Sequence, residues 1–380
     1  MTAVLKPGDT IGILGDEFSS TQLINCSRDA GLRIVTYSTK SNSQIRRQAD
    51  VALVGGWDDR DQLRRFGEAC QVVTYVSDEL SAAMVDYLRQ FTIVPQGNDL
   101  LSIVQDRGLQ HAFFDQLNVN SVPYETVVDE HDMQVATASL GFPAVLKPIV
   151  RMTRTDPFFI LHQSSDIQLA SQYFQAGSFV MESVVPFQQS LAVIATKDQQ
   201  GEIQQFPPVV IKTFAQGQRT IYTVMDDVEA ELVAEMQRIT KEIGQHVDYV
   251  GTYEINFGYT ATGTLYVCGV ETTVSNTGYL FDLAMNINEY RQHLRAISGL
   301  PISPVKKYRD VIMQTFTRRQ VPLVLELREQ HPDWQFIFSY RQAALSNSYS
   351  GCLLIQTADL QQAMAELEAS GLGPQTAGKN

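Results

Sequence analysis

The first 90 residues alternate short apolar segments with helical ones, and few folds accommodate that pattern. We predict strands over residues 10–15, 32–37, 51–54 and 72–75. We predict helices over residues 18–30, 59–69 and 79–90, with Gly31 ending the first of them. Strands and helices that alternate over short connections form a parallel sheet covered by helices. In such sheets ligands bind beyond the carboxyl ends of the strands.

The turn after the first strand excludes a dinucleotide site of the usual kind. Gly12 and Gly15 are followed by Asp16, Glu17 and residues 18–20 (Phe-Ser-Ser), so the later glycines of a GxGxxG fingerprint are absent. Two carboxylates at this turn would also repel a pyrophosphate. We therefore reject an NAD-binding domain.

Beyond residue 98 the chain has three parts: a helical region with four short strands, an antiparallel sheet with a helix and a hairpin, and a small β-rich unit. Alternating β-branched residues are typical of antiparallel strands and predict the middle part. The predicted elements are, in order, a helical region 98–117, strands 123–128, 143–149, 157–161 and 178–181, the sheet 190–224, helix 228–243, strands 249–257 and 264–270, helix 284–298, helices 322–330 and 359–370, and a disordered tail 371–380.

Charge and cysteine usage restrict the partners and the compartment. The 29 Lys and Arg residues face 42 Asp and Glu residues, which gives a net charge of −13 and argues against nucleic acid or an anionic membrane as partner. Four cysteines lie far apart with no CxxC pair, as in proteins of a reducing compartment. No signal peptide is evident, and no apolar run approaches the ~18 residues of a membrane span. We expect a cytoplasmic protein.

Eight motifs follow one another along the chain: PGDTIGILG (7–15), QVVTY (71–75), VPQGNDLLSIVQDR (94–107), FPAVLKP (142–148), VMESVVPF (180–187), VGTYEINF (250–257), LYVCGVETTVSNTGY (265–279) and HLRAISGLP (293–301). In this order they resemble the motifs of the ATP-grasp superfamily and, within it, of the N5-carboxyaminoimidazole ribonucleotide synthetases. No single motif decides the matter, but so many in order make the resemblance strong.

The resemblance implies an α/β ATP-grasp fold with an N-terminal parallel-sheet (pre-ATP-grasp) domain and a small β-rich C-terminal domain. The corresponding domains are residues 1–100, 101–300 and 301–370. It also implies a homodimer that carboxylates aminoimidazole ribonucleotide, with ATP and Mg²⁺, through carboxyphosphate formed from bicarbonate. The partners would then be a nucleotide and a phosphoribosyl substrate.

The resemblance assigns ATP contacts to four residues. Lys147 ends an apolar strand and would contact the phosphates as a point charge, although a lysine that merely closes a strand is the alternative. Arg107 would also touch phosphate, and a helix-surface arginine is nearly as good an interpretation. Glu182 and Val185 would form the hinge that binds adenine, the alternative for Glu182 being a strand-end carboxylate on a loop.

Glu254 and Glu271 are the predicted metal ligands. They lie on two strands joined by a short turn, and two carboxylates brought together by a hairpin suit Mg²⁺, which uses few carboxylates plus phosphates. Asn276 matches an asparagine of the family's metal and substrate loop and is the predicted substrate-binding residue. His293 and Arg295 also match family positions, but packing and domain contacts explain them at least as well. No catalytic residue is assigned.

The positions at which this sequence differs from the family are concentrated in the motifs that bind ATP and the substrate. The glycine-rich ATP lid is replaced by RMTRTDPF (151–158), which contains no glycine to bring backbone amides over the phosphates. Residues 188–190 are neutral where an acid that contacts the ribose is expected, and the segments 16–20, 207–211, 270–279 and 344–351 also lack the family's substrate motifs. Two classes therefore stay open: a carboxylating ATP-grasp enzyme, and a divergent relative that has another substrate or binds a nucleotide or a partner without catalysis.

Overall fold

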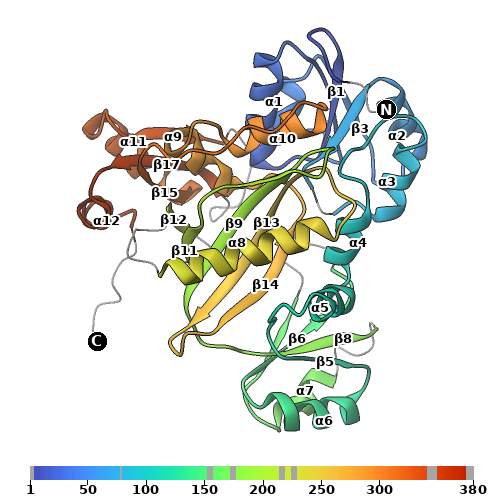
Figure 1. Cartoon of the computed structure of the whole chain (residues 1–380), viewed down its shortest axis with the longest axis vertical. Coiled ribbons are helices and arrows are strands. Elements are labelled where there is room, and N and C mark those ends of the chain that lie inside the picture. The colour runs from blue at the N-terminus through green and yellow to red at the C-terminus, as the bar shows by residue number, and fades with distance from the viewer. Residues whose placement is uncertain are drawn as a thin grey trace.

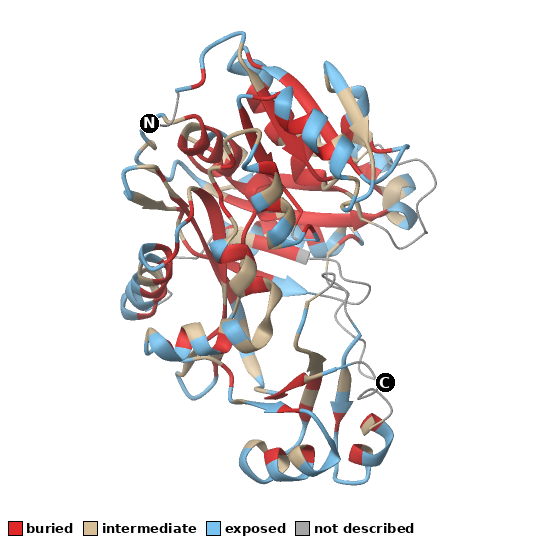
Figure 2. Cartoon of the chain, turned by 90° about the vertical axis from the view of Figure 1, so that its right-hand side faces the viewer, coloured by how far each residue is buried: buried red, intermediate tan, exposed pale blue. Residues whose placement is uncertain are grey.

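The computed structural model describes residues 4–77, 79–151, 157–171, 177–213, 219–223, 229–339 and 349–373. Three sheets follow one another down the long axis of the molecule (Figure 1). Buried residues are concentrated in the strands of the N-terminal and central sheets, whereas the helices around the small sheet are exposed on their outer sides (Figure 2). Within the described residues no helix is long and apolar enough to cross a membrane.

The N-terminal sheet is parallel, as the alternating pattern predicts. Its order is β3-β2-β1-β4, so the sequence neighbours β1 and β2 pair and β4 returns to the other side of β1. Gly12 serves packing in β1, because a Cβ there would lie 2.7 Å from Val73 and 2.8 Å from the Phe66 ring. The elements are β1 (Thr10–Leu14), α1 (Phe18–Asp29), β2 (Arg33–Ser38), the 3-10 helix η1 (Gln44–Arg47), β3 (Val51–Val54), α2 (Arg60–Glu68), β4 (Val72–Tyr75) and α3 (Ala82–Leu88).

A small antiparallel sheet of order β5-β8-β6-β7 forms the lower lobe in Figure 1 and has a hydrophobic core of its own. In β6 the alternating side chains of Ala144 and Leu146 are buried against Met133 of the covering helix α6. The two helices α4 and α5 lead into this lobe, and Asp106 separates them because its carboxylate caps α5 at the Leu109 amide (2.9 Å). The elements are α4 (Asp99–Gln105), α5 (Arg107–Gln116), β5 (Tyr124–Val127), α6 (Glu130–Leu140), β6 (Ala144–Pro148), β7 (Phe159–Leu161), α7 (Asp166–Ala170) and β8 (Phe179–Ser183).

The central sheet has nine strands in the order β14-β13-β9-β11-β12-β15-β17-β16, with β10 paired to β9. The strands after Pro301 extend this sheet, because β15 pairs with β12. Helix α8 packs on it through Met236 and Ile243. The elements are β9 (Phe187–Lys197), β10 (Ile203–Gln205), β11 (Val209–Thr213), β12 (Arg219–Thr223), α8 (Ala230–Gln245), β13 (Gly251–Thr260), β14 (Leu265–Glu271), η4 (Asn276–Leu280), α9 (Phe281–Ala284), α10 (Glu289–Ile297), β15 (Asp310–Thr317), η5 (Arg318–Gln320), α11 (Val321–Gln330), β16 (Gln335–Phe338), β17 (Tyr349–Thr357) and α12 (Leu360–Ala369).

Two sequence predictions need correction. The helix expected over residues 284–298 begins only at Glu289, because Met285 is extended and the Asn288 side chain caps the helix at the Arg291 amide (2.8 Å). The disorder expected from residue 371 is wrong for residues 371–373, since Leu372 is 2% exposed and packs in the core of the C-terminal strands. Residues 374–380 lie outside the described part of the chain.

A buried hydrogen-bond network around His293 ties the N-terminal sheet to the central sheet. His293 Nδ1 accepts from the Thr252 amide (3.0 Å), so its Nε2–H faces Thr74 Oγ1 at 2.9 Å. Thr74 in turn donates to Gln96 Oε1 (2.6 Å), and the Gln96 amide nitrogen reaches the Thr272 carbonyl (3.3 Å). Burial lowers the pKa of His293 to about 3, so the ring is neutral. The structure thus gives His293 the packing role that the sequence favoured.

Replacing His293 by Ala is expected to destabilise the fold by about 2–4 kcal/mol, because it leaves a cavity and two buried polar groups without their partner. Urea unfolding followed by circular dichroism measures this. The free energy of unfolding should also fall as the pH drops from about 6.5 toward 3. In this range the histidine binds a proton in the unfolded chain but stays neutral when buried in the fold. His293→Gln should lack that His293 contribution to the pH dependence. Arg295→Ala is the control, and an equal loss of stability there would contradict the assignment.

Candidate nucleotide and metal site

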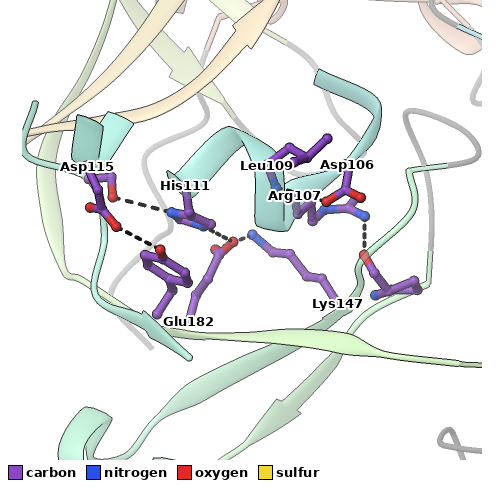
Figure 3. Close-up of polar contacts among 10 residues, drawn as sticks. Asp106, Arg107, Leu109, His111, Asp115, Lys147 and Glu182 are labelled. Atoms are coloured by element: carbon purple, nitrogen blue, oxygen red, sulfur yellow. Dashed lines mark hydrogen bonds and ion pairs between the residues drawn. The ribbon is translucent and has the colours of Figure 1, made fainter. Parts of the chain in front are cut away.

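A cavity of about 510 Å³ lies between the small sheet and strand β14. Side chains from three elements converge on it: Arg107 and His111 from α5, Lys147 from β6 and Glu182 from β8 (Figure 3). The β6 and β8 strands are neighbours in the small sheet, with Val145 opposite Glu182, which brings the lysine and the glutamate together. The sequence-predicted residues Arg107, Lys147 and Glu182 therefore line one cavity.

Glu182 is a buried carboxylate between two nitrogen-bearing side chains. Lys147 Nζ lies 2.6 Å from its Oε2, and His111 Nε2 lies 3.2 Å from its Oε1. Burial raises the pKa of Glu182, but the hydrogen bond from His111 and the positive charge of Lys147 outweigh it and hold the pKa at about 2. Glu182 is therefore ionised, and the ammonium group of Lys147, which also lines the cavity, lies beside it.

His111 is a site residue that sequence reasoning missed. Its ring stacks on Tyr124 with centroids 4.0 Å apart, and its Nδ1 lies 3.3 Å from Ser121 Oγ. A carboxylate only accepts, so the ring nitrogen facing Glu182 carries the proton. One signal could have found it: His111 stands four residues after Arg107, and positions four apart share one face of a helix.

Arg107 lines the cavity, whereas Val185 is not among the described residues that line it. Arg107 donates from Nη1 to the Pro148 carbonyl (2.6 Å), and its amide donates to the Ile149 carbonyl (2.8 Å), so the helix start is tied to the strand that carries Lys147. The Val185 carbonyl accepts from the Phe187 amide (3.0 Å) in the turn between β8 and β9. The hinge segment is thus an ordered turn that directly follows Glu182.

A second cavity of about 400 Å³ adjoins the first, and Arg151, Asn256 and Glu271 line both. Glu254 of β13 and Glu271 of β14 are direct cross-strand partners, so their side chains rise from the same face of the sheet. Asn276 lines this cavity too. The hairpin predicted from the sequence does bring the two carboxylates together.

Ser275 holds Glu254 in place. Its hydroxyl donates to Glu254 Oε2 (2.8 Å), while its amide donates to Glu289 Oε1 (2.6 Å) and its carbonyl accepts from the Tyr290 hydroxyl (2.7 Å). Glu289 is 1% exposed, and burial together with the nearby Glu254 charge raises its pKa well above the usual range. Ser275 is therefore fixed on three sides.

The donor set fits magnesium bound together with a nucleotide. No group of three or more His, Cys, Asp or Glu side chains suited to a metal occurs in the described ranges. Mg²⁺ needs fewer protein ligands than that, because it keeps waters and shares the phosphates. Asn276 Oδ1 supplies a further oxygen: it is buried and accepts no hydrogen bond from the described residues. Arg151 Nη2 lies 3.5 Å from Glu271 Oε1, at the boundary of the two cavities.

Parts of the altered motifs fall outside the structure's described ranges. Of the lid segment 151–158, residues 152–156 are not described, and neither are residues 344–348 of the C-terminal segment. Tyr349, which directly follows, lines the second cavity.

Comparison with known proteins identifies the class. Residues 9–105 match the model of the ribonucleotide synthetase preATP-grasp domain, and residues 112–290 match that of the ATP-grasp domain. The fold agrees with that of a solved ADP complex of an N5-carboxyaminoimidazole ribonucleotide synthetase, with a TM-score of 0.91 at 22% identity and 98% of each chain covered. The chain is an ATP-grasp protein with an N-terminal preATP-grasp domain.

Within the ATP-grasp proteins the chain resembles the N5-carboxyaminoimidazole ribonucleotide synthases over nearly its full length. It is 23% identical over 325 residues to the Bacillus subtilis protein of that name, covering 85% of each chain. A structure of the Aspergillus clavatus synthase in complex with ADP and 5-aminoimidazole ribonucleotide matches with a TM-score of 0.86 at 16% identity, covering 96% of this chain and 98% of that one.

Proposed function

We propose that this chain binds Mg-ATP and uses it to carboxylate an amine, with bicarbonate as the carboxyl source. The observation that carries the proposal is that the Lys147–Glu182 pair and the Glu254–Glu271 pair line two adjoining cavities. One cavity thus supplies a cation for phosphate, and the other supplies carboxylates for a metal. The first candidate reaction is that of the relatives: carboxylation of aminoimidazole ribonucleotide through carboxyphosphate.

Each residue has a defined task in this proposal. Lys147 and Arg107 contact the ATP phosphates, Glu182 and the backbone around Val185 bind adenine, and Glu254 and Glu271 hold Mg²⁺. The metal would neutralise charge on the phosphates when bound. Lys147 exchanges part of its contact with Glu182 for phosphate, and His111 still donates to the buried carboxylate.

The second candidate is a divergent ATP-grasp protein that has another acceptor or that binds nucleotide or a partner without turnover. A specific observation favours it. The second cavity is walled by Ile221, Met313 and Tyr349, and Arg151 is its single cationic side chain in the described part of the chain. A phosphorylated acceptor is ordinarily held by several cations or backbone amides.

The two candidates are separated by ADP release measured with Mg-ATP, bicarbonate and aminoimidazole ribonucleotide. The relatives' reaction predicts ADP formation at least ten-fold above the rate without acceptor, and such a result would exclude the non-catalytic form. A Mg-ATP thermal shift without acceptor-dependent ADP favours the divergent protein. Absence of any shift contradicts nucleotide binding and the proposal as a whole. The homodimer stays a prediction, which light scattering after size-exclusion chromatography tests.

A further inference from the structure

The acceptor for the proposed transfer has to occupy the second cavity. This cavity shares Arg151, Asn256 and Glu271 with the nucleotide cavity, so a molecule in it lies next to the expected phosphate end of ATP. Group transfer requires the reacting atoms to come within about 3–3.5 Å of one another. The side chains of the second cavity therefore decide which acceptor the protein takes.

Two of those side chains are carboxylates, which only accept hydrogen bonds, while the Asn, Ser, Thr and Tyr side chains of the lining both donate and accept. Glu254 and Glu271 are carboxylates, and the buried Asn276 Oδ1 accepts nothing from the described residues. Among the described lining residues the cation is Arg151, whose guanidinium lies 3.5 Å from Glu271. A magnesium ion held by the two glutamates would be shared with the ATP phosphates, which leaves little positive charge for a second phosphate group. The two carboxylates and Asn276 Oδ1 are the groups of this wall that a ligand donating N–H bonds would use.

Aromatic side chains occupy the neighbouring position where a parallel sheet would offer a phosphate site. Phosphates bind where a strand of such a sheet ends and the next helix begins. Here Phe18, the first residue of α1, stacks on Tyr279 (centroids 4.9 Å apart, 26° between planes) and meets Tyr349 edge-on at 5.1 Å. Phe18 is 4% exposed and Tyr279 is 1% exposed, so these rings are packed.

The negative charges directly before α1 also argue against a phosphate site there. Asp16 accepts from Ser43 Oγ (2.6 Å), and Glu17 is the N-cap residue directly before α1. Carboxylates at this position oppose a phosphate, because they compete for the same helix end. The aromatic group of Phe18, Tyr279 and Tyr349 then continues directly into the wall of the second cavity through Tyr349.

We infer that the acceptor is a small amine that carries no phosphate group. This inference rests on the proposed carboxylation of an amine and selects its second candidate, a protein whose acceptor is not the ribonucleotide. In the step it describes, the amine nitrogen forms a bond to the carboxyl carbon of carboxyphosphate, the bond from that carbon to the phosphate oxygen breaks, and phosphate leaves with the electron pair. The nitrogen gives up one proton, and the product is a carbamate.

The test compares two probes that differ only in the phosphate: 5-aminoimidazole riboside and the corresponding ribonucleotide. Calorimetric titrations with Mg²⁺ and a non-hydrolysable ATP analogue give their Kd values, and ethanolamine and putrescine extend the set to smaller amines. We expect an unphosphorylated amine to bind at least as tightly as the ribonucleotide and to accelerate ADP release with ATP and bicarbonate. A preference for the ribonucleotide overturns the inference, and so does failure of every unphosphorylated probe to bind.

One variant sharpens the comparison. Asn276→Lys places a cation in the cavity and should shift the ratio of the two Kd values at least ten-fold toward the ribonucleotide, whereas Asn276→Gln should not shift it. An unchanged ratio in the lysine variant would place the acceptor elsewhere. The Mg-ATP thermal shift is measured separately: its absence refutes the proposed function, while a normal shift with the wrong probe ranking refutes only the acceptor class.

Discussion

Glu271→Gln is expected to remove the magnesium dependence of ATP binding. Glu271 lies opposite Glu254 on the β13–β14 hairpin, and the neutral amide keeps the shape while it removes one of the two carboxylates for the ion. We expect the apparent Kd for Mg-ATP to rise by about 10–100-fold, the range known for damaged metal sites. Titration calorimetry at fixed ATP and varied Mg²⁺ measures it.

Two controls accompany this variant. Glu202→Gln changes an exposed carboxylate near the start of β10 and should leave Mg-ATP binding unchanged. Unfolding of the Glu271→Gln protein should stay cooperative, which separates loss of the ion from loss of the fold. Wild-type magnesium dependence in the Glu271 variant would move the metal away from the hairpin.

Lys147→Met is expected to affect both ATP binding and stability. The substitution removes the cation proposed for the phosphates, and it takes a partner from Glu182, whose side chain is 10% exposed. Breaking a buried ion pair costs about 3–5 kcal/mol, and because the Lys147 side chain is 32% exposed we expect about 1–3 kcal/mol here. Urea unfolding and Mg-ATP titration on the same protein measure the two effects.

The double variant Lys147→Met, Glu182→Gln separates these effects. It removes the stranded charge and should recover most of the stability, but it should not recover ATP binding. The pKa of Glu182 is about 2 in the folded protein against 4.5 ordinarily, so the contribution of the pair is present above pH 4.5 and is lost as the pH falls toward 2. The stability difference between wild type and Lys147→Met should shrink over that range. Recovered ATP binding in the double variant would exclude a phosphate role for Lys147.

Local signals predicted much of this structure. The N-terminal sheet follows from its alternating pattern, and the Glu254–Glu271 pair follows from a hairpin whose strands are joined by a short turn. The start of α10 was predicted five residues too early, at residue 284, although Asn before Glu289 is a standard helix start. A capping residue of this kind is easily overlooked inside a periodic segment.

Contacts between distant segments could not be predicted in the same way. Lys147 and Glu182 were assigned separate roles, and only the pairing of β6 with β8 shows that they form an ion pair. The burial of Phe18 against Tyr279 depends on how the N-terminal domain meets the central sheet, since the two residues are 261 positions apart. Spacing along a sequence carries no information on such a distance.

The His293 network bears on how such chains are classified. Gln96 and His293 belong to two of the motifs by which the sequence resembles the N5-carboxyaminoimidazole ribonucleotide synthetases, and both lie in the buried network between two sheets. Selection for a stable contact between the N-terminal and central sheets would retain Gln96 and His293 whatever reaction the protein catalyses. A genome survey that assigns purine biosynthesis from these two motifs would therefore include proteins that share the fold but not the reaction. The cavity-lining residues are the better markers of a shared substrate.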